Sequence, residues 1–326
     1  MRLTLAVPEL LALDRDALAA TRSLSALARY SGAPTVRRGS LDDFLVAPHG
    51  SATAALAALG AGHDPAASYV LRADPVSLVA GRNDVALGAR IGDLDVGESE
   101  AMMATLNAHF GGDGLVFRSP RPDAWFVQMD VAPDLATTPS SAVRGAIHSH
   151  LPTGPDAPKW RRWLSEMQML LHGHPANAAR AARGRVPVNG VWISGGGRLT
   201  DTPDMPGARM FAGIGSIGDV ARGLARRQRS AAPEPPPHFP ALQGRTDAVV
   251  VLPRVDRGAF GELDRLWLAP AVVALERGAL DELALLADGD GVASAWRAAR
   301  PAWSRRAIAA IAKHPFASPV PDEDDA

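Results

Sequence analysis

Few polar residues of this chain have the spacing of a known catalytic or binding site. One candidate is Pro48-His49-Gly50, a tight loop directly ahead of an Ala- and Leu-rich helix expected over residues 51–59. The N-terminus of a helix presents unpaired backbone N–H groups, which can bind an anion. Ser51 begins this helix, and its hydroxyl can take part in chemistry or simply cap the helix. Both interpretations of Ser51 stay open.

Three other patterns give weaker indications of a site. His172 and His174 lie two residues apart beyond a helix end, with no further histidine or carboxylate at a metal-ligand spacing, and are interpreted as surface or packing residues. The run Gly195-Gly196-Gly197 follows a predicted strand, but it is not the G-x-G-x-x-G pattern of a dinucleotide site. The arginine-rich segment 222–229 is interpreted as a solvated helix face rather than a contact for RNA or an acidic partner.

Composition excludes several classes of function. The 326 residues include no cysteine, so disulfides, thiolate nucleophiles, Cys-type zinc sites and iron–sulfur clusters are excluded. The net charge of −1 gives no electrostatic reason to expect nucleic acid or an anionic membrane as a partner. Residues 1–13 are apolar, but Glu9 and Asp14 come too soon for a secretory segment or a membrane span. We therefore expect a cytoplasmic protein, and 47% hydrophobic residues suffice for a large core.

The hydrophobic pattern predicts alternating strands and helices. Strands are expected at residues 3–7, 69–71, 85–87, 115–117, 125–129, 188–193, 248–252 and 283–286. Helices are expected at residues 16–30, 51–59, 98–109, 160–171, 177–183, 262–277 and 303–312. The shorter β-like stretches between residues 69 and 130 indicate a second lobe. Residues 231–240 are a proline-rich loop, and residues 320–326 are an acidic tail.

Three stretches, in the same order along the chain, carry a resemblance to a known family. Residues 21–29 (TRSLSALAR) are similar to a T-P-N-L-x-x-L-A helix, and residues 50–60 (GSATAALAALG) are similar to a G-S-D-T-A-H-L-S-L-L-G segment. The third stretch is HPANAAR at 174–180, followed by PVN at 187–189 and GGG at 195–197. Together they resemble the archaeal-type cofactor-independent phosphoglycerate mutases of the alkaline phosphatase superfamily. Within this relationship, the chain looks closest to the RpfE-type regulatory proteins.

The resemblance implies an α/β fold with an alkaline-phosphatase-like three-layer core and an inserted smaller α+β lobe. On this basis residues 1–75 and 205–326 are expected to form the discontinuous core. Residues 76–204 are expected to form the inserted lobe. The sequence itself supports only the alternation of strands and helices and the change of pattern in the middle of the chain.

The resemblance also implies a catalytic site that this chain keeps only in part. In the family, two divalent metals held by Asp, His and Ser activate a serine that accepts and returns a phosphoryl group. Ser51 matches that serine, and Asp256 and Asp288 match two aspartate ligands. Phe260 and Gly289 stand at the positions of two histidine ligands. At most a single Mg²⁺- or Mn²⁺-like ion is expected, or no cofactor.

Two further ligand positions of the family are also altered. The Asp-Gly that follows the first strand of the family is Pro8-Glu9 here, and Glu9 can reach a metal only if the register shifts by one residue. The C-terminal histidine has no clear counterpart, because His314 is the only histidine after Asp288.

The lobe motif is better kept than the metal site. The resemblance implies that Asn177, Arg180, Asn189 and Arg198 contact the carboxylate and phosphate of a substrate, with Arg72 as a further anion contact. The structural alternative is that Asn177 caps a helix and Asn189 holds a turn.

Two hypotheses of function follow. The first is a degenerate phosphoglycerate-mutase-like protein that binds a phosphorylated or carboxylated metabolite, or a protein partner, and acts in regulation. The second is a metal-dependent phosphomutase or phosphatase with a rebuilt site that uses Ser51. The loss of both histidines favours the first hypothesis, in which the protein is not an enzyme.

Overall fold

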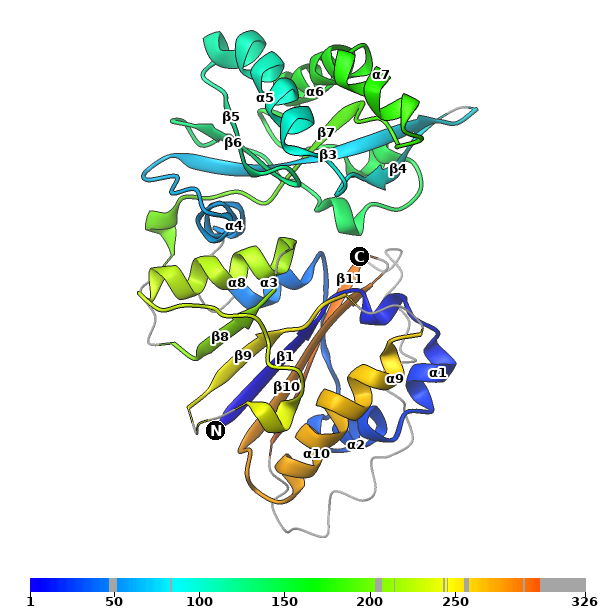
Figure 1. The fold of residues 1–326 in the computed structure, drawn as a ribbon, viewed down its shortest axis with the longest axis vertical. Coiled ribbons are helices and arrows are strands. Elements are labelled where there is room, and N and C mark those ends of the chain that lie inside the picture. The colour runs from blue at the N-terminus through cyan, green and yellow to red at the C-terminus, as the bar shows by residue number, and fades with distance from the viewer. Residues whose placement is uncertain are drawn as a thin grey trace. The chain divides into compact units, whose positions relative to one another are not determined.

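The computed structural model describes residues 1–46, 52–82, 84–202, 207–213, 215–242, 244, 246–254, 258–289 and 291–299. The chain divides into two compact units. The first comprises Met1–Leu41, Gly207–Gly213 and the residues from Ala232 onward, and the second comprises Asp42–Pro206 and Ile214–Ala231. Each unit is built around its own β-sheet (Figure 1).

The first unit contains a six-stranded sheet in the order β2-β11-β10-β1-β9-β8. Its strands are β1 (Arg2–Val7), β2 (Thr35–Arg38), β8 (Arg209–Ala212), β9 (Ala248–Val251), β10 (Glu282–Gly289) and β11 (Val292–Ala299). Its helices are α1 (Arg15–Ala19), α2 (Arg22–Ser31), α9 (Phe260–Leu263), α10 (Ala269–Glu276), the 3₁₀ turns η1 (Leu10–Ala12) and η7 (Phe239–Ala241), and the π-helical segment η8 (Asp264–Leu268).

Parallel pairing forms the centre of this sheet. β1 pairs in parallel with β9 on one side and β10 on the other, and β8 pairs in parallel with β9. β11 and β2 extend the β10 side in antiparallel pairing. Strands buried on both faces are typically continuous apolar runs, and in β1 both Leu5 and its neighbour Ala6 are fully buried.

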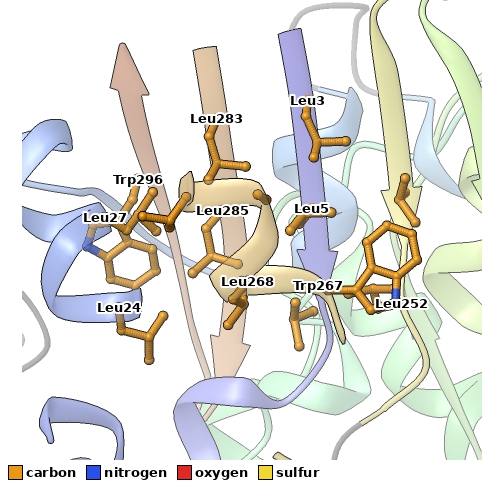
Figure 2. Packing of buried hydrophobic residues seen from close by; sticks show 14 of the residues in the cluster. Leu3, Leu5, Leu24, Leu27, Leu252, Trp267, Leu268, Leu283, Leu285 and Trp296 are labelled. Carbon is orange, nitrogen blue, oxygen red and sulfur yellow. The ribbon is translucent and has the colours of Figure 1, made fainter. Parts of the chain in front are cut away.

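Helices α2, α9, η8 and α10 pack their apolar sides on one face of this sheet (Figure 2). Because successive side chains of a strand alternate between faces, every second residue of β1 and β10 enters this core. The labelled members of the cluster in Figure 2 are Leu3, Leu5, Leu24, Leu27, Leu252, Trp267, Leu268, Leu283, Leu285 and Trp296. Burial of these large side chains is the main stabilising term of the unit.

The helix expected over residues 262–277 is present but is not uniform. It consists of α9, the π-helical η8 and α10. Pro270 lies in the first turn of α10 and has no N–H to donate to the carbonyl of Leu266 one turn earlier. A local change of hydrogen-bond spacing before a proline accommodates that missing donor.

The second unit contains a five-stranded sheet in which β3 is central. β3 (Tyr69–Ala80) pairs with β4 (Val85–Arg90), β6 (Ala124–Met129) and β7 (Gly190–Ser194), and β5 (Val116–Arg121) pairs with β6. The helices are α4 (Thr53–Ala61), α5 (Val96–Phe110), α6 (Ala157–His172), α7 (Pro175–Ala182) and α8 (Ser216–Arg227). The short helix α3 (Leu41–Val46) begins at the boundary of the two units.

The domain boundaries differ from those expected. A boundary at residue 75 would divide β3, because this strand continues past Pro75 to Ala80. The carbonyl of Pro75 accepts a hydrogen bond from the N–H of Ile91, 2.9 Å away. Residues 42–75 and 214–231 are part of the second unit, since α4 packs along α8.

The mixed α/β class is confirmed by these two sheets and their helices. The helix expected over residues 160–171 is present as α6, and its apolar stripe is a core face, with Trp160, Trp163, Met167 and Leu171 buried. Strands β2, β8 and β11 and helix α3 were not anticipated, and the helix expected over 303–312 lies outside the described residues. Within the residues that the structure describes, no helix has the length and apolar character needed to cross a membrane.

Two glycines allow α4 and α8 to approach closely. A Cβ atom built on Gly60 would lie 1.8 Å from the carbonyl oxygen of Asp219. A Cβ on Gly223 would lie 1.9 Å from the carbonyl oxygen of Leu56. Both contacts are with helix backbone, which cannot rotate away as a side chain can, so the two helices must separate to admit a methyl group.

We expect Gly60→Ala and Gly223→Ala each to lower the free energy of unfolding by about 1–3 kcal/mol or more, because overpacking forces backbone shifts. Urea unfolding followed by circular dichroism measures this. Gly111→Ala is the matched control, since Gly111 has helical φ and ψ and no atom near its built Cβ. Equal effects at positions 60 and 111 would contradict the close approach of the helices.

Candidate functional site

The carboxyl ends of β10, β1 and β9 lie next to one another on the first sheet. The register pairs Ala6 with both Leu286 and Val251, so the three strands end at one edge. Ligands of open α/β sheets generally bind at this edge. Asp288 lies near the end of β10 and Glu9 follows β1, so this edge is the candidate site.

The carboxylate of Asp288 binds backbone N–H groups of two other segments. Oδ1 accepts the N–H of Glu9 at 2.7 Å, and Oδ2 accepts the N–H of Leu41, the first residue of α3, at 3.3 Å. Charge-assisted hydrogen bonds of this kind are stronger than those between neutral groups. Asp288 therefore connects the end of β10 to the turn after β1 and to the start of α3.

Glu9 has a backbone conformation that is unusual for a residue with a side chain. Its φ of 59° and ψ of 16° lie in the left-handed region, which favours glycine. Its carboxylate Oε2 lies 2.6 Å from Nη2 of Arg254, which follows β9. The sequence interpretation missed Arg254, although its position just after the predicted strand 248–252 is a signal that could have identified it.

The two positions at which the resemblance expects histidine do not hold a metal ligand. A Cβ on Gly289 would lie 2.3 Å from the backbone nitrogen of Ala12 and 2.5 Å from the carbonyl carbon of Leu11. No side chain of any kind is accommodated there without movement of η1. Phe260 is only 9% exposed and packs in the apolar core of the first unit.

The described residues therefore do not fit a two-metal site. Among them, no group of three or more His, Asp or Glu side chains is arranged to hold a metal ion. Pro8 has no ligand atom, and Glu9 faces a guanidinium. Ser51 and Asp256 lie outside the described residues, as does His314. Of the expected ligands Ser51, Asp256 and Asp288, the structure therefore places only Asp288.

Arg180, expected to contact substrate, lies inside an ion-pair network of the second unit. Its side chain is 0% exposed. Nη1 donates to Glu98 at 2.7 Å, Nη2 to Asp93 at 2.6 Å, and Nε to the carbonyl of Val186 at 2.8 Å. These bonds join α7 to the start of α5. A ligand could reach this guanidinium only if the network opened.

The two asparagines hold neighbouring segments together. Asn177 is buried, donates to the carbonyls of Leu171 and Val188, and accepts the N–H of Val188 at 2.9 Å. Asn189 exchanges hydrogen bonds with both backbone groups of Leu78. These contacts are structural but differ from the expected ones, because His174 rather than Asn177 caps α7 and Asn189 bonds to β3. A role of either amide in substrate binding stays a prediction.

The remaining two arginines also contact the protein itself. Arg198 is partly exposed and donates to the carbonyl oxygens of Ala67 and Asp130. Arg72 is 8% exposed and donates through Nη2 to the carbonyl of Ser216 at 2.8 Å. Of the three arginines at the expected substrate positions, Arg180 is the least accessible and Arg198 the most.

The other candidate features have structural roles. His174 caps α7, with Nδ1 accepting the N–H of Ala176 at 3.2 Å, and its Nε2 lies 3.1 Å from the hydroxyl of Thr105. The run 195–197 packs against the start of α4, where a Cβ on Gly197 would lie 2.6 Å from Cα of Ala52. This backbone approach explains the glycines without a dinucleotide.

The arginines of segment 222–229 are not simply solvated. Arg222 is only 17% exposed and forms an ion pair with the fully buried Asp219. Arg226 donates to the carbonyl of Leu59 at 2.5 Å, near the end of α4. Cations near a helix C-terminus stabilise its free carbonyl groups, so these side chains stabilise the α4–α8 pair.

Comparison with known proteins gives one low-identity relationship. No family model matches the sequence. The chain is 27% identical over 173 residues to the 2,3-bisphosphoglycerate-independent phosphoglycerate mutase of Methanosarcina barkeri. This match covers 46% of the chain and spans 42% of the length of that relative. The chain is phosphoglycerate-mutase-like at low identity.

Solved structures that are similar to this mutase-like chain include two archaeal proteins. The cofactor-independent phosphoglycerate mutase of Thermoplasma acidophilum is 17% identical, with a TM-score of 0.38 and coverage of 91% of this chain and 89% of that one. A protein of Pyrococcus horikoshii is 14% identical, with a TM-score of 0.44 and coverage of 91% and 87%.

We expect Asp288→Ala to lower the free energy of unfolding by about 2–4 kcal/mol, because two backbone N–H groups lose their acceptor. Asp288→Asn keeps one carbonyl oxygen and should cost roughly half as much. Chemical denaturation of the three proteins measures the difference. If Asp288→Ala were as stable as the wild type, the carboxylate would not hold the turn after β1.

Acid should weaken the network around Arg180. The hydrogen bond from Arg180 lowers the pKa of the Asp93 carboxyl below its usual value. A carboxyl whose folded pKa is lowered adds stability above its unfolded pKa of about 3.9, and this stability is lost as pH falls through the folded pKa.

The free energy of unfolding of the wild type should therefore fall between about pH 5 and pH 3 more steeply than that of Asp93→Asn. Denaturant unfolding at several pH values measures this slope. Asp113→Asn, at an exposed position of η3 (Gly111–Asp113), is the control and should keep the wild-type slope. Identical slopes for the wild type and Asp93→Asn would disprove the contribution of Asp93.

Proposed function

We propose that this chain is a degenerate phosphoglycerate-mutase-like protein with little or no mutase activity. It binds a phosphorylated or carboxylated metabolite, or a protein partner, and acts in regulation, as the resemblance to the RpfE-type proteins implies. The observation that carries this proposal is the close approach of η1 to Gly289, which leaves no space for a side chain at an expected ligand position.

The chemistry of phosphoryl transfer supports the same conclusion. Two cations neutralise the charge of the transferring group and lower the pKa of an attacking hydroxyl. Phe260 and Gly289 offer no ligand atom, and Asp288 already accepts two backbone N–H groups. Without paired metals, a serine hydroxyl is a weak nucleophile at neutral pH. We therefore infer that no cofactor, rather than a single divalent cation, acts at this edge.

Recognition of an anion can survive the loss of catalysis, because binding needs only positioned donors. Arginine suits carboxylate and phosphate groups through its planar fork of N–H donors. Arg198 is the most accessible of the arginines at the expected substrate positions, so we assign it the main contact with such a metabolite. Asn177, Asn189, Arg72 and Arg180 then act by holding the fold around it.

Metal analysis and turnover assays of the purified protein test the proposal. We expect no stoichiometric metal, and no turnover of 3-phosphoglycerate or p-nitrophenyl phosphate above that of Ser51→Ala, with or without added Mn²⁺. Stoichiometric metal, with turnover abolished in Ser51→Ala, would instead establish a metal-dependent mutase or phosphatase with a rebuilt site. Calorimetric titration with 3-phosphoglycerate, compared between the wild type and Arg198→Ala, tests metabolite binding separately.

A further inference from the structure

A charged residue lies at the carboxyl end of each of three adjacent parallel strands. Asp288 belongs to β10, Glu9 follows β1 and Arg254 follows β9. Contacts connect them in the same order, from the Asp288 carboxylate to the N–H of Glu9 at 2.7 Å, and from the Glu9 carboxylate to Arg254 at 2.6 Å. The edge thus places two carboxylates and one guanidinium together.

We propose that Arg254 supplies a positive charge at this edge and thereby helps to exclude divalent cations from Glu9 and Asp288. The inference rests on the proposed function and identifies a residue that adds to the exclusion of metal ions from this edge. A guanidinium remains charged at all physiological pH values, so this cation is permanent and needs no uptake from solution.

The backbone explains why Glu9 meets Arg254. The left-handed conformation of Glu9 is held by the bond from its N–H to Asp288, so the direction of its side chain depends on the end of β10. Leu252, two residues before Arg254, is fixed by donating to the carbonyl of Ala6 at 2.9 Å. Both partners of the ion pair therefore start from anchored strand ends.

The ion pair is exposed enough to be removed without loss of the fold. The side chain of Arg254 is 70% exposed and that of Glu9 is 24% exposed. Exposed ion pairs contribute little to stability, so a variant at position 254 should fold. The charge of Arg254 should affect the binding of a divalent cation more than it affects stability. A divalent ion feels twice the repulsion of a monovalent one at the same distance.

Titration with Mn²⁺ alone, by calorimetry on the full chain, tests the proposal. We expect Arg254→Ala to bind Mn²⁺ about tenfold more tightly than the wild type, and Arg254→Lys, which keeps the charge, to remain like the wild type. Arg265→Ala removes an equally exposed arginine that faces a single carboxylate, Glu262, and should also leave Mn²⁺ binding unchanged. Adding Glu9→Gln to Arg254→Ala should abolish the gain.

The outcomes separate the two proposals. If the wild type binds no stoichiometric metal and Arg254→Ala binds Mn²⁺ no more tightly, this inference is overturned and the proposed function is left intact. Tight stoichiometric Mn²⁺ binding by the wild type overturns the proposed function. A gain that persists in the double variant with Glu9→Gln places the new ion elsewhere and also overturns this inference. Urea midpoints of all variants confirm that the folded proteins are compared.

Discussion

The carboxylate of Asp288 determines the shape of the edge at which the first sheet presents its charged residues. It accepts backbone N–H groups from Glu9 and Leu41, which are distant from it in the sequence. A carboxylate engaged in this way has less capacity to coordinate a metal than one exposed to solvent. The same bond holds Glu9 in its left-handed conformation, so the position of the Glu9 carboxylate and its contact with Arg254 both follow from it.

The turn after β1 has a glycine-like backbone at Glu9, where the resemblance expects glycine. The resemblance aligns Pro8-Glu9 with Asp-Gly, and Glu9 still has the positive φ that a glycine adopts without cost. A residue with a Cβ pays roughly 1–2 kcal/mol for this conformation, and the Asp288 bond offsets part of it. The turn thus has a backbone conformation that glycine adopts freely, while its side chain forms an ion pair with Arg254.

Sequence patterns predicted the parts of the fold that burial decides locally. The run of β1 and the apolar stripe of α6 were identified because each element carries its own periodicity. The expected domain boundary at residue 75 falls inside β3, since the sequence around Pro75 gives no sign of partners that come from β7 and from the segment after β4. Sequence reasoning is limited in the same way for Arg180, one of the expected substrate residues. Its type suggests an anion contact, but Asp93 and Glu98, over 80 residues away, occupy its donors.

Packing constrains the two positions at which the resemblance expects histidine. Gly289 faces the backbone of Leu11 and Ala12, so a histidine there requires η1 to move. η1 in turn follows Glu9, whose N–H donates to Asp288. Asp288 precedes Gly289 in β10. Phe260 contributes to the apolar core, and replacing it by a polar ligand would leave that ligand buried or open a cavity. A histidine at either position would therefore need compensating changes in the residues that pack against it.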